Sequence, residues 1–166
     1  HAHHAHHDAL DNVVRALTRR GIDVRLVRAP ALIASDLESV DCIFTAGGDG
    51  TVLETAARIK SNEIPVLSIN TDPSLSHGHL CAFRLNSGQS FDKGVLDKLK
   101  RGLFSPNPRS RIQVHYKSRD EHSPLLALNE VFYAERDASR PTVHETRLPS
   151  VCPAGLVQRS SGVIVA

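Results

Sequence analysis

The chain has 166 residues, of which 40% are hydrophobic and 23% charged, and its formal net charge is +2 with histidines neutral. This length and composition are typical of one globular domain, or of one domain with part of a second. The net charge is too small to indicate nucleic acid as a partner. No apolar run approaches the roughly 20 residues that a membrane-spanning helix needs, so we expect no membrane span.

The chain has three cysteines, Cys42, Cys81 and Cys152, which are widely spaced and form no CxxC pair. This pattern argues against a disulfide framework and against a zinc knuckle, and it favours a reducing compartment. The first residue is a histidine, and no signal or transit sequence is visible. The residues themselves therefore indicate no cellular location.

The N-terminal stretch "HAHHAHHD" contains five histidines. Histidines three and four positions apart can share a helix face and bind a metal ion, but no carboxylate or cysteine pattern accompanies them. We therefore favour a tag-like or linker segment over a metal site. The next stretch, "DALDNVVRALTRRG", has apolar residues at helical spacing and predicts a helix with Asp8 as N-cap and Gly21 as its stop.

Helix and strand patterns alternate through the first ~105 residues. Strands are predicted in "IDVRLV", "SVDCIFTA" and "IPVLSIN", and helices in "TVLETAARIK" and "SFDKGVLDKLKRG". Phe91, Val95, Leu96 and Leu99 are expected to face inward from the last helix, although Gly94 weakens it. This alternation predicts an α/β domain, residues 1–105, in which helices cover a parallel sheet.

The pattern changes after the proline-bearing stretch "FSPNPRSR". "RIQVHYK", "LLALNEVFYAE" and "SGVIVA" are strand-like, and no helical pattern separates them. We expect polar connections over 118–124 and 135–155. Residues 106–166 therefore predict the beginning of a β-rich domain. Because the last strand stops at Ala166 without a turn, we expect this domain to be incomplete and the chain to be a truncated fragment.

The stretch "TAGGDGT", residues 45–51, lies between a predicted buried strand and a predicted helix. Glycines allow close backbone approach, and free N–H groups at a helix start attract anions. It is neither a Walker A loop nor GxGxxG. Asp49 could act as a general base or hold Mg²⁺, and both roles fit phosphoryl transfer. An Asp-Gly turn of type I′ or II is the alternative, which the strand–loop–helix context disfavours.

GGDGT resembles the signature of NAD kinases, of diacylglycerol and sphingosine kinases and, as GGDG, of phosphofructokinases. Further stretches distinguish among these: "SINTDPSLSHGHLC" resembles the asparagine loop of NAD kinases, "ALNEVF" their Asn-Glu motif, and "SSGVIVA" the strand before their next loop. The N-terminal stretch through "IDVRLV" is similar to mitochondrial-type members. On these motifs the chain is identified as a member of the NAD kinase family.

The resemblance implies a Rossmann-like parallel sheet domain of the NAD kinase/diacylglycerol kinase type, followed by a β-sandwich domain. It also implies that Asp49 activates the adenosine-ribose 2′-hydroxyl of NAD for attack on ATP, with Mg²⁺ nearby, to give NADP. The other implied binding residues are Gly47, Gly48, Gly50, Thr51, Asn70, Asp72, Asn129 and Glu130. A mitochondrial, otherwise cytoplasmic, location and a homodimer are implied as well.

Residue chemistry alone leaves several roles open. Asn70 and Asp72 fit strand-end and turn chemistry as well as ligand binding. Asn129 and Glu130 interrupt an apolar stretch and need partners if they are buried.

The sequence also departs from many family members at Gly78-His79-Leu80 and at Ser161-Gly162. The resemblance further implies that a Thr-Gly-Ser-rich loop, which completes the NAD pocket in the family, would follow Ala166, so we expect the chain alone to be impaired.

Two alternatives to an NAD kinase stay open from the sequence. A lipid kinase would share GGDGT, but "VLETAARI" lacks the Asn-Glu-rich continuation expected there, and the NTDP stretch fits it poorly. A nucleotide-binding or dimerising module without catalysis would bind NAD or ATP without turnover. The basic stretches "KLKRG" and "PRSR" carry few aromatics, so a helix end and a solvated linker explain them better than a nucleic-acid patch.

Overall fold

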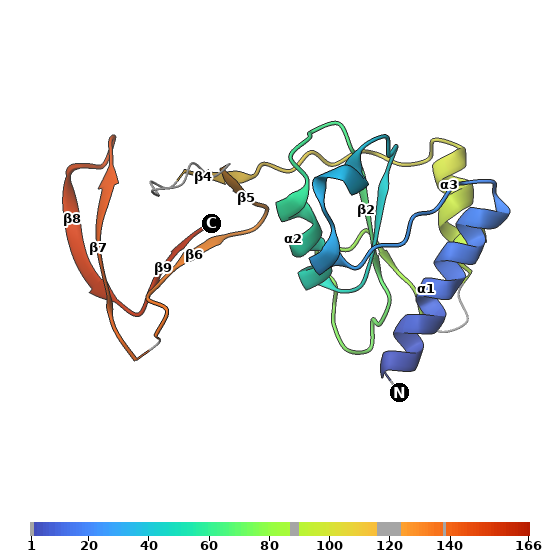
Figure 1. Cartoon of the computed structure of the whole chain (residues 1–166), viewed down its shortest axis with the longest axis horizontal. Helices are drawn as coiled ribbons and strands as arrows, with labels where there is room; N and C mark the ends of the chain where they lie inside the picture. Colours follow the sequence, from blue (N-terminus) through green and yellow to red (C-terminus); the bar gives the residue numbers. More distant parts are fainter. Residues whose placement is uncertain (1, 87–89, 116–123, 138) are drawn as a thin grey trace.

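The structure of the protein is a computed structural model that describes residues 2–86, 90–115, 124–137 and 139–166. An α/β unit formed by the N-terminal part lies at one end of the molecule in Figure 1, and antiparallel strands from the C-terminal part follow it. The predicted class, an α/β unit followed by β-structure, is confirmed. Within the described residues, no helix combines the length and apolar character needed to cross a membrane.

The first helix, α1 (Ala2–Arg19), starts earlier than predicted. The histidine-rich stretch forms its first turns, so both the linker interpretation and the Asp8 N-cap are wrong. Alanine has the highest helix propensity and histidine is tolerated, so nothing in this stretch stops the helix. Gly21 ends it as predicted, with φ at 73°. Its N–H donates to Thr18 O at 3.0 Å and that of Ile22 to Leu17 O at 3.2 Å, a Schellman motif.

The strand predicted over residues 22–27 is absent. The segment is irregular, and it leads into the short 3₁₀ helices η1 (Ala29–Ala31) and η2 (Ala34–Leu37). Ile22 and Leu26 are 43% and 64% exposed. Alternating residues favour an extended backbone, but a strand also needs a hydrogen-bonded neighbour. No described strand pairs with this segment.

Three parallel strands form the sheet, in the order β1 (Ile43–Ala46), β2 (Val66–Asn70) and β3 (Phe83–Arg84). Ile43 is paired with Val66, and Ile69 with Phe83. The predicted strands at β1 and β2 and their parallel arrangement are confirmed. β3 was not predicted, because a two-residue strand carries too little periodicity to be recognised.

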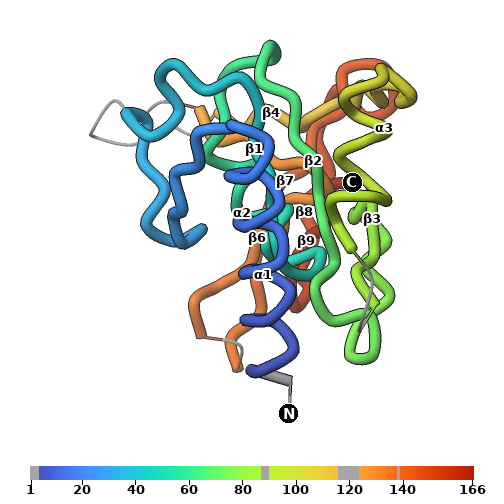
Figure 2. The backbone as a smooth tube through the Cα atoms, turned by 90° about the vertical axis from the view of Figure 1, so that its right-hand side faces the viewer, coloured from blue at the N-terminus to red at the C-terminus, as the bar shows by residue number. Residues whose placement is uncertain are grey.

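Helices cover both faces of this sheet. α2 (Asp49–Arg58) lies on one side, and α1 and α3 (Asp97–Lys100) lie on the other, as Figures 1 and 2 show. A π-helical turn, η3 (Asp92–Leu96), precedes α3 and includes Gly94, where the sequence predicted one continuous helix. The side chains predicted to face inward from this region are buried or packed against the core.

The hydrophobic core lies between the sheet and the α1–η3 side. Its buried members are Val13, Ala16, Leu17, Ile69, Leu85, Phe91, Val95 and Leu96. The rings of Phe44 and Phe91 meet edge to face with centroids 6.1 Å apart, an arrangement that aromatic pairs prefer. This core fixes β2, whose last residue, Asn70, enters the site described below.

Antiparallel pairs make up the C-terminal part. β4 (Ile112–Val114) pairs with β5 (Leu125–Ala127), and β6 (Val131–Tyr133) pairs with β9 (Val163–Val165). These strands lie where strand-like stretches were predicted. They form separate two-stranded sheets in the described residues, so the predicted β-sandwich is not tested.

A hairpin of β7 (Thr142–Leu148) and β8 (Cys152–Ser160) contradicts the polar connection predicted over 135–155. Prolines misled the prediction. Pro149 lies inside the tight turn, where the Val151 N–H donates to Leu148 O at 3.0 Å. Proline is favoured in turns, and in edge strands it need not donate a hydrogen bond.

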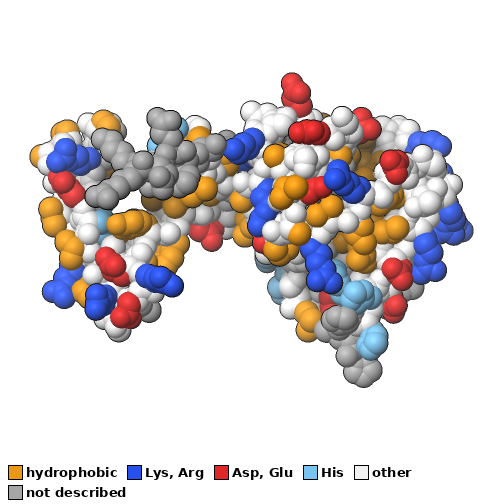
Figure 3. Space-filling view, in the orientation of Figure 1, with side chains coloured by type: hydrophobic (Ala, Val, Ile, Leu, Met, Phe, Trp, Pro, Cys, Tyr) orange, Lys and Arg blue, Asp and Glu red, His pale blue; other side chains and the backbone are white. Residues whose placement is uncertain are grey.

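The C-terminal strands bury little. Beyond residue 100, Thr142 is the one buried residue among those described. Large apolar side chains are exposed on these strands, and hydrophobic atoms show on the surface of this part in Figure 3. They include Leu125, Phe132, Tyr133, Val143, Leu156, Val157, Ile164 and Val165. The described part of this region therefore has no hydrophobic core of its own.

Candidate functional site

The GGDGT loop connects β1 directly to α2. Gly48 is the N-cap in extended conformation, and Asp49 and Gly50 are the first residues of the helix. The Asp-Gly turn alternative is therefore wrong. Gly47 donates its N–H to Ile69 O at 2.9 Å, which ties the loop to β2. A Cβ on Gly47 would lie 2.9 Å from the Cβ of Thr51, so this close approach requires glycine.

Asp49 is held by a loop from a distant part of the sequence. Its carboxylate oxygens accept the backbone N–H of His79 at 2.9 Å and of Leu80 at 2.8 Å. Hydrogen bonds to an ionised acceptor are stronger than neutral ones, and a negative charge in the first turn complements the dipole of α2. The carboxylate therefore has a fixed place at the N-terminal end of this helix.

Cys81 lies beside this carboxylate, in the same loop. Its Sγ is 3.6 Å from Gly47 O and 3.8 Å from Asp49 Oδ1. Burial raises the pKa of the Cys81 thiol, and the nearby charge of Asp49 raises it further. The sulfur is therefore a neutral thiol at neutral pH, and it adds no negative charge to the site.

Asn70 ends β2 with its side chain buried, at 1% exposure. Its Nδ2 donates to Ser76 O at 2.9 Å, and its Oδ1 accepts the N–H of Asp72 at 3.0 Å. The amide therefore closes the loop that follows β2. Asp72 adds an Asx turn, because its Oδ1 accepts the Ser74 N–H at 3.2 Å and the Ser74 hydroxyl. The turn roles considered for both residues are confirmed.

A cavity of about 350 Å³ opens between the glycine loop and the asparagine loop. Its lining residues are His6, Gly47, Gly48, Thr51, Asn70, Thr71, Asp72, Leu75 and Ser76. This volume falls in the range of small-molecule pockets. Five predicted binding residues thus border one space: Gly47, Gly48, Thr51, Asn70 and Asp72. Three segments far apart in sequence form this space, as expected at the carboxyl ends of parallel strands.

Other predicted site residues do not line this cavity. Asp49 and Gly50 begin α2 and are not lining residues. Asn129 and Glu130 are exposed between β5 and β6, and the Asn129 amide donates to the Glu130 carboxylate. The structure therefore pairs these two residues with each other and does not bring them to the cavity.

Sequence reasoning missed four lining residues: Thr71, Leu75 and Ser76 in the loop after β2, and His6. His6 belongs to α1, and its Nδ1 is 2.8 Å from the hydroxyl of Thr71. The spacing of the histidines suggested a shared helix face, but it gave no indication that this face meets the loop after β2.

Metal ligands do not gather in the described part of the chain, where no three His, Cys, Asp or Glu side chains could hold an ion together. Mg²⁺ at nucleotide sites is typically held by one or two carboxylates and the substrate phosphates, not by a protein cage. Asp72, which lines the cavity, and Asp49 are carboxylates of this kind.

Comparison with known protein families decides the relationship. The family described as "ATP-NAD kinase N-terminal domain" matches residues 9–93, which contain the sheet, α2 and both loops of the cavity. The chain belongs to the NAD kinase family. This membership confirms the resemblance drawn from GGDGT and the NTDP stretch and overturns the lipid-kinase alternative.

Curated relatives agree with this family. The chain is 30% identical to "NAD kinase 2, mitochondrial" of Rattus norvegicus over 86% of its own length, and 33% identical to the Mus musculus protein over 77%. It is also 30% identical to "Probable NADH kinase" of Oryza sativa subsp. japonica over 76%. These alignments cover 42%, 29% and 41% of the three relatives, so the chain spans less than half of their length.

Proposed function

We propose that the chain supplies the phosphoryl-transfer half of an NAD kinase, which transfers the γ-phosphoryl group of ATP to the adenosine-ribose 2′-hydroxyl of NAD. The observation that supports this proposal is the position of the Asp49 carboxylate. The loop N–H groups of His79 and Leu80 hold its carboxylate at the N-terminal end of α2, directly beside the cavity-lining Gly47 and Gly48. A carboxylate fixed beside an anion-favouring helix start suits a base that must act next to phosphates.

In the proposed reaction the 2′-hydroxyl oxygen forms a bond to the γ-phosphorus of ATP. The bond between that phosphorus and the β,γ-bridging oxygen breaks, and ADP leaves with the electron pair. The hydroxyl proton goes to Asp49, which then releases it to solvent. Hydrogen bonds of a base in a ligand-free site often rearrange when substrate binds, so the contacts with His79 and Leu80 are compatible with this role.

The cavity residues position the substrates in this proposal. The Gly48 N–H and the Thr51 hydroxyl offer hydrogen bonds to phosphate oxygens. Gly47, whose own N–H donates to Ile69 O, contributes close backbone approach. Asn70 and Asp72 keep the opposite loop in place, and Gly50 allows close approach at the helix start. Asp72 is the cavity-lining carboxylate that would hold Mg²⁺ together with the ATP phosphates, and the ion would offset their negative charge.

The binding of ribose hydroxyls by Asn129 and Glu130 belongs to the same proposal. Both side chains are exposed and could exchange their mutual hydrogen bond for a ligand. We also propose a mitochondrial location and a homodimer. The location is supported by relatives named "NAD kinase 2, mitochondrial". The apolar side chains exposed on the C-terminal strands offer surface for further association.

The test is formation of NADP from NAD, ATP and Mg²⁺ by the chain and by Asp49→Asn. Loss of a positioned base typically lowers kcat about 100- to 10,000-fold. Asp23→Asn is the matched control, because it removes an exposed carboxylate outside the cavity and should leave turnover unchanged. Turnover that Asp49→Asn leaves intact contradicts the base assignment. If neither chain turns over but both bind NAD, a binding module without catalysis becomes the better description.

A further inference from the structure

One cavity residue comes from outside the two loops that the family motif describes. His6 is half-buried in the second turn of α1, and its imidazole Nδ1 lies 2.8 Å from Thr71 Oγ1. Thr71 directly follows Asn70 and is itself buried, at 4% exposure. The hydrogen bond joins residues 65 positions apart, so it fixes the ring of a helix residue against the loop that borders the cavity.

The geometry of this bond leaves a defined chemical group for a ligand. A histidine ring has two nitrogens, and Thr71 engages Nδ1, so Nε2 is the second polar atom of the ring. The Thr71 hydroxyl can donate to Nδ1 or accept from it. Nε2 can therefore carry a proton whether the ring is neutral or charged. An Nε2–H group is a hydrogen-bond donor suited to an anionic oxygen.

The other residues of the cavity indicate which anion would meet this donor. Gly47 and Gly48 precede the N-terminus of the ten-residue helix α2, where backbone N–H groups favour phosphate. Asp72 contributes a negative charge to the same lining. A phosphate group in a cavity that Asp72 also lines therefore gains from a further donor, and among the described histidines of α1 only His6 lines the cavity.

We infer that His6 is a phosphate-binding residue of this site: its Nε2 donates a hydrogen bond to a phosphate oxygen of the bound nucleotide, and Thr71 positions the ring. The inference rests on the proposed function, since it assigns the substrate phosphates to the same cavity. The phosphate belongs to the pyrophosphate of NAD or to the polyphosphate of ATP. α1 thereby becomes part of the binding site as well as a cover of the sheet.

Paired substitutions separate ligand binding from a purely structural role. The amide of Asn reaches about as far as Nδ1, and the amide of Gln reaches about as far as Nε2. If His6 binds phosphate, His6→Asn should weaken binding about as much as His6→Ala, roughly 10- to 100-fold for a lost hydrogen bond to a charged group. His6→Gln should retain most of the affinity. If His6 only anchors Thr71, His6→Asn should be the variant that retains affinity.

Thr71→Val and His4→Ala complete the set. Thr71→Val removes the hydroxyl but keeps the side-chain shape, and it should weaken binding less than His6→Ala does. His4→Ala replaces an exposed histidine of the same helix outside the cavity and should have no effect. Binding is measured by calorimetry with NAD, with ATP and with inorganic pyrophosphate as separate probes. The probe whose affinity depends on His6 identifies the phosphate that it contacts.

Nuclear magnetic resonance of the imidazole nitrogens of the unmodified chain distinguishes failure of this inference from failure of the proposed function. We expect the His6 Nε2 resonance to shift on addition of NAD or ATP, together with the Gly47 and Gly48 amides. If the glycine amides shift without His6, the inference is overturned and the proposed function stands. If none of the three probes shifts any of these resonances, both are overturned.

Discussion

The side-chain amide of Asn70 occupies the space in which a side chain at Gly78 would have to lie. A Cβ built on Gly78 would be 2.5 Å from Asn70 Nδ2 and 3.1 Å from Asn70 Cβ. Gly78 also has φ at 60°, in the left-handed region that other residues rarely adopt. The loop from Asn70 to Gly78 therefore closes only because one end provides a buried amide and the other end has no side chain.

Gly78→Ala should destabilise the protein by about 2–4 kcal/mol. Alanine in left-handed conformation costs roughly 1–2 kcal/mol, and displacing the buried Asn70 amide breaks hydrogen bonds worth a similar amount. Binding of NAD or ATP should weaken with it, because Asn70 lines the cavity. Urea unfolding measures the first effect and calorimetry the second.

Gly21→Ala is the matched control for this prediction. Gly21 also has positive φ, at 73°, but a Cβ there would meet nothing within 4 Å. Gly21→Ala should lower the free energy of unfolding only by the cost of the left-handed backbone, about 1–2 kcal/mol, and should leave ligand binding intact. Equal destabilisation by the two variants contradicts the claim that the Asn70 contact contributes.

Sequence reasoning located the two loops that border the cavity, because their chemistry is local. A buried strand followed by GGDGT and a helix start predicts an anion site without further information. The turn roles of Asn70 and Asp72 could also be predicted, since strand-end amides and carboxylates form turns within a few residues. The sequence does not predict the hydrogen-bond donors to Asp49, because the backbone N–H groups of His79 and Leu80 have no sequence signature.

The other absent or wrong predictions depend on contacts that the local sequence pattern does not show. His6 touches Thr71 across the fold, and helical spacing shows a shared face but not what the face meets. Residues 22–27 alternate like a strand, yet no described strand pairs with them. In the hairpin of β7 and β8 the prolines concealed a strand pattern, because Pro149 belongs to a turn that the pairing needs.

Arg111 should stabilise α2 from its C-terminal end. Its guanidinium donates to Ile59 O and, at 2.9 Å, to Asn62 Oδ1, with Ala56 O and Lys60 O each 3.5 Å away. A cation at this end of a helix complements both the dipole and the free carbonyls. Arg111→Ala should lower the free energy of unfolding by about 1–2 kcal/mol.

Arg111→Lys tests the geometry of this cap. A single ammonium cannot reproduce the planar fork that reaches several acceptors, so Lys should recover only part of the loss. Arg109→Ala, at an exposed arginine two positions earlier, is the control and should change little. Urea unfolding compares the three variants. Full recovery by Lys contradicts the multi-acceptor cap.

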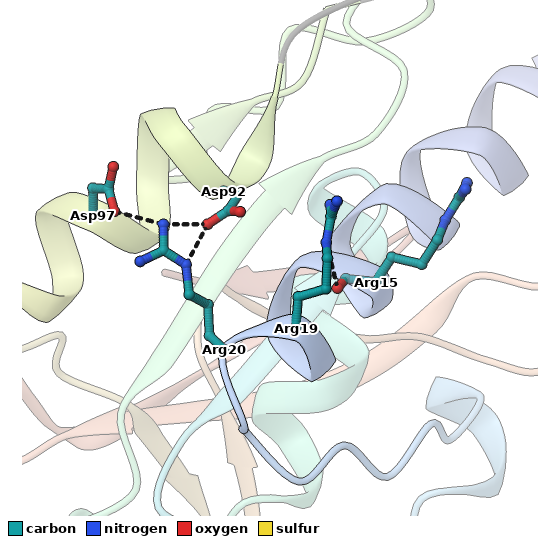
Figure 4. A network of polar contacts seen from close by, with 5 residues as sticks. All are labelled: Arg15, Arg19, Arg20, Asp92 and Asp97. Carbon is teal, nitrogen blue, oxygen red and sulfur yellow. Dashed lines mark hydrogen bonds and ion pairs between the residues drawn. The ribbon is translucent and has the colours of Figure 1, made fainter.

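Arg20 should stabilise the packing of the end of α1 against the η3–α3 region through two ion pairs. Its Nη2 is 2.6 Å from Asp92 Oδ1 and 2.7 Å from Asp97 Oδ1, and its Nε also donates to Asp92 (Figure 4). These bonds, first Asp92 and then Asp97, raise the pKa of Arg20 above its ordinary value. Arg20→Gln should lower the melting temperature modestly, because the pairs are exposed to solvent.

Salt dependence identifies this effect as electrostatic. The penalty of Arg20→Gln should shrink between low salt and about 1 M salt, where the Debye length falls to about 3 Å. Arg19→Gln is the matched control, because Arg19 Nε donates to the backbone oxygen of Arg15 in its own helix (Figure 4). A penalty that is independent of salt, or one that Arg19→Gln shares, contradicts the ion-pair account.

Cys81 should ionise at higher pH in the folded chain than in the unfolded chain. Burial raises its pKa most, and the neighbouring Asp49 charge adds to this. The thiolate is the species that reacts with iodoacetamide, so the alkylation rate follows its ionised fraction. For the folded chain, the midpoint of the rate–pH curve should therefore lie at higher pH than for the chain unfolded in urea. By linkage, the stability that this group contributes is full below the unfolded pKa and is lost as pH rises through the raised pKa.

Asp49→Asn should lower the Cys81 midpoint without returning it to the unfolded value, because burial, the larger cause, remains. Mass spectrometry of the alkylated peptides measures Cys81 and Cys42 in one sample. Cys42 is the internal control: burial also raises its pKa, but the nearby carboxylate is Asp41, so its midpoint should not move. The midpoint, not the maximal rate, is the relevant quantity, since a loosened loop would change access and hence the maximal rate. An unchanged Cys81 midpoint would show that the Asp49 charge does not reach the sulfur.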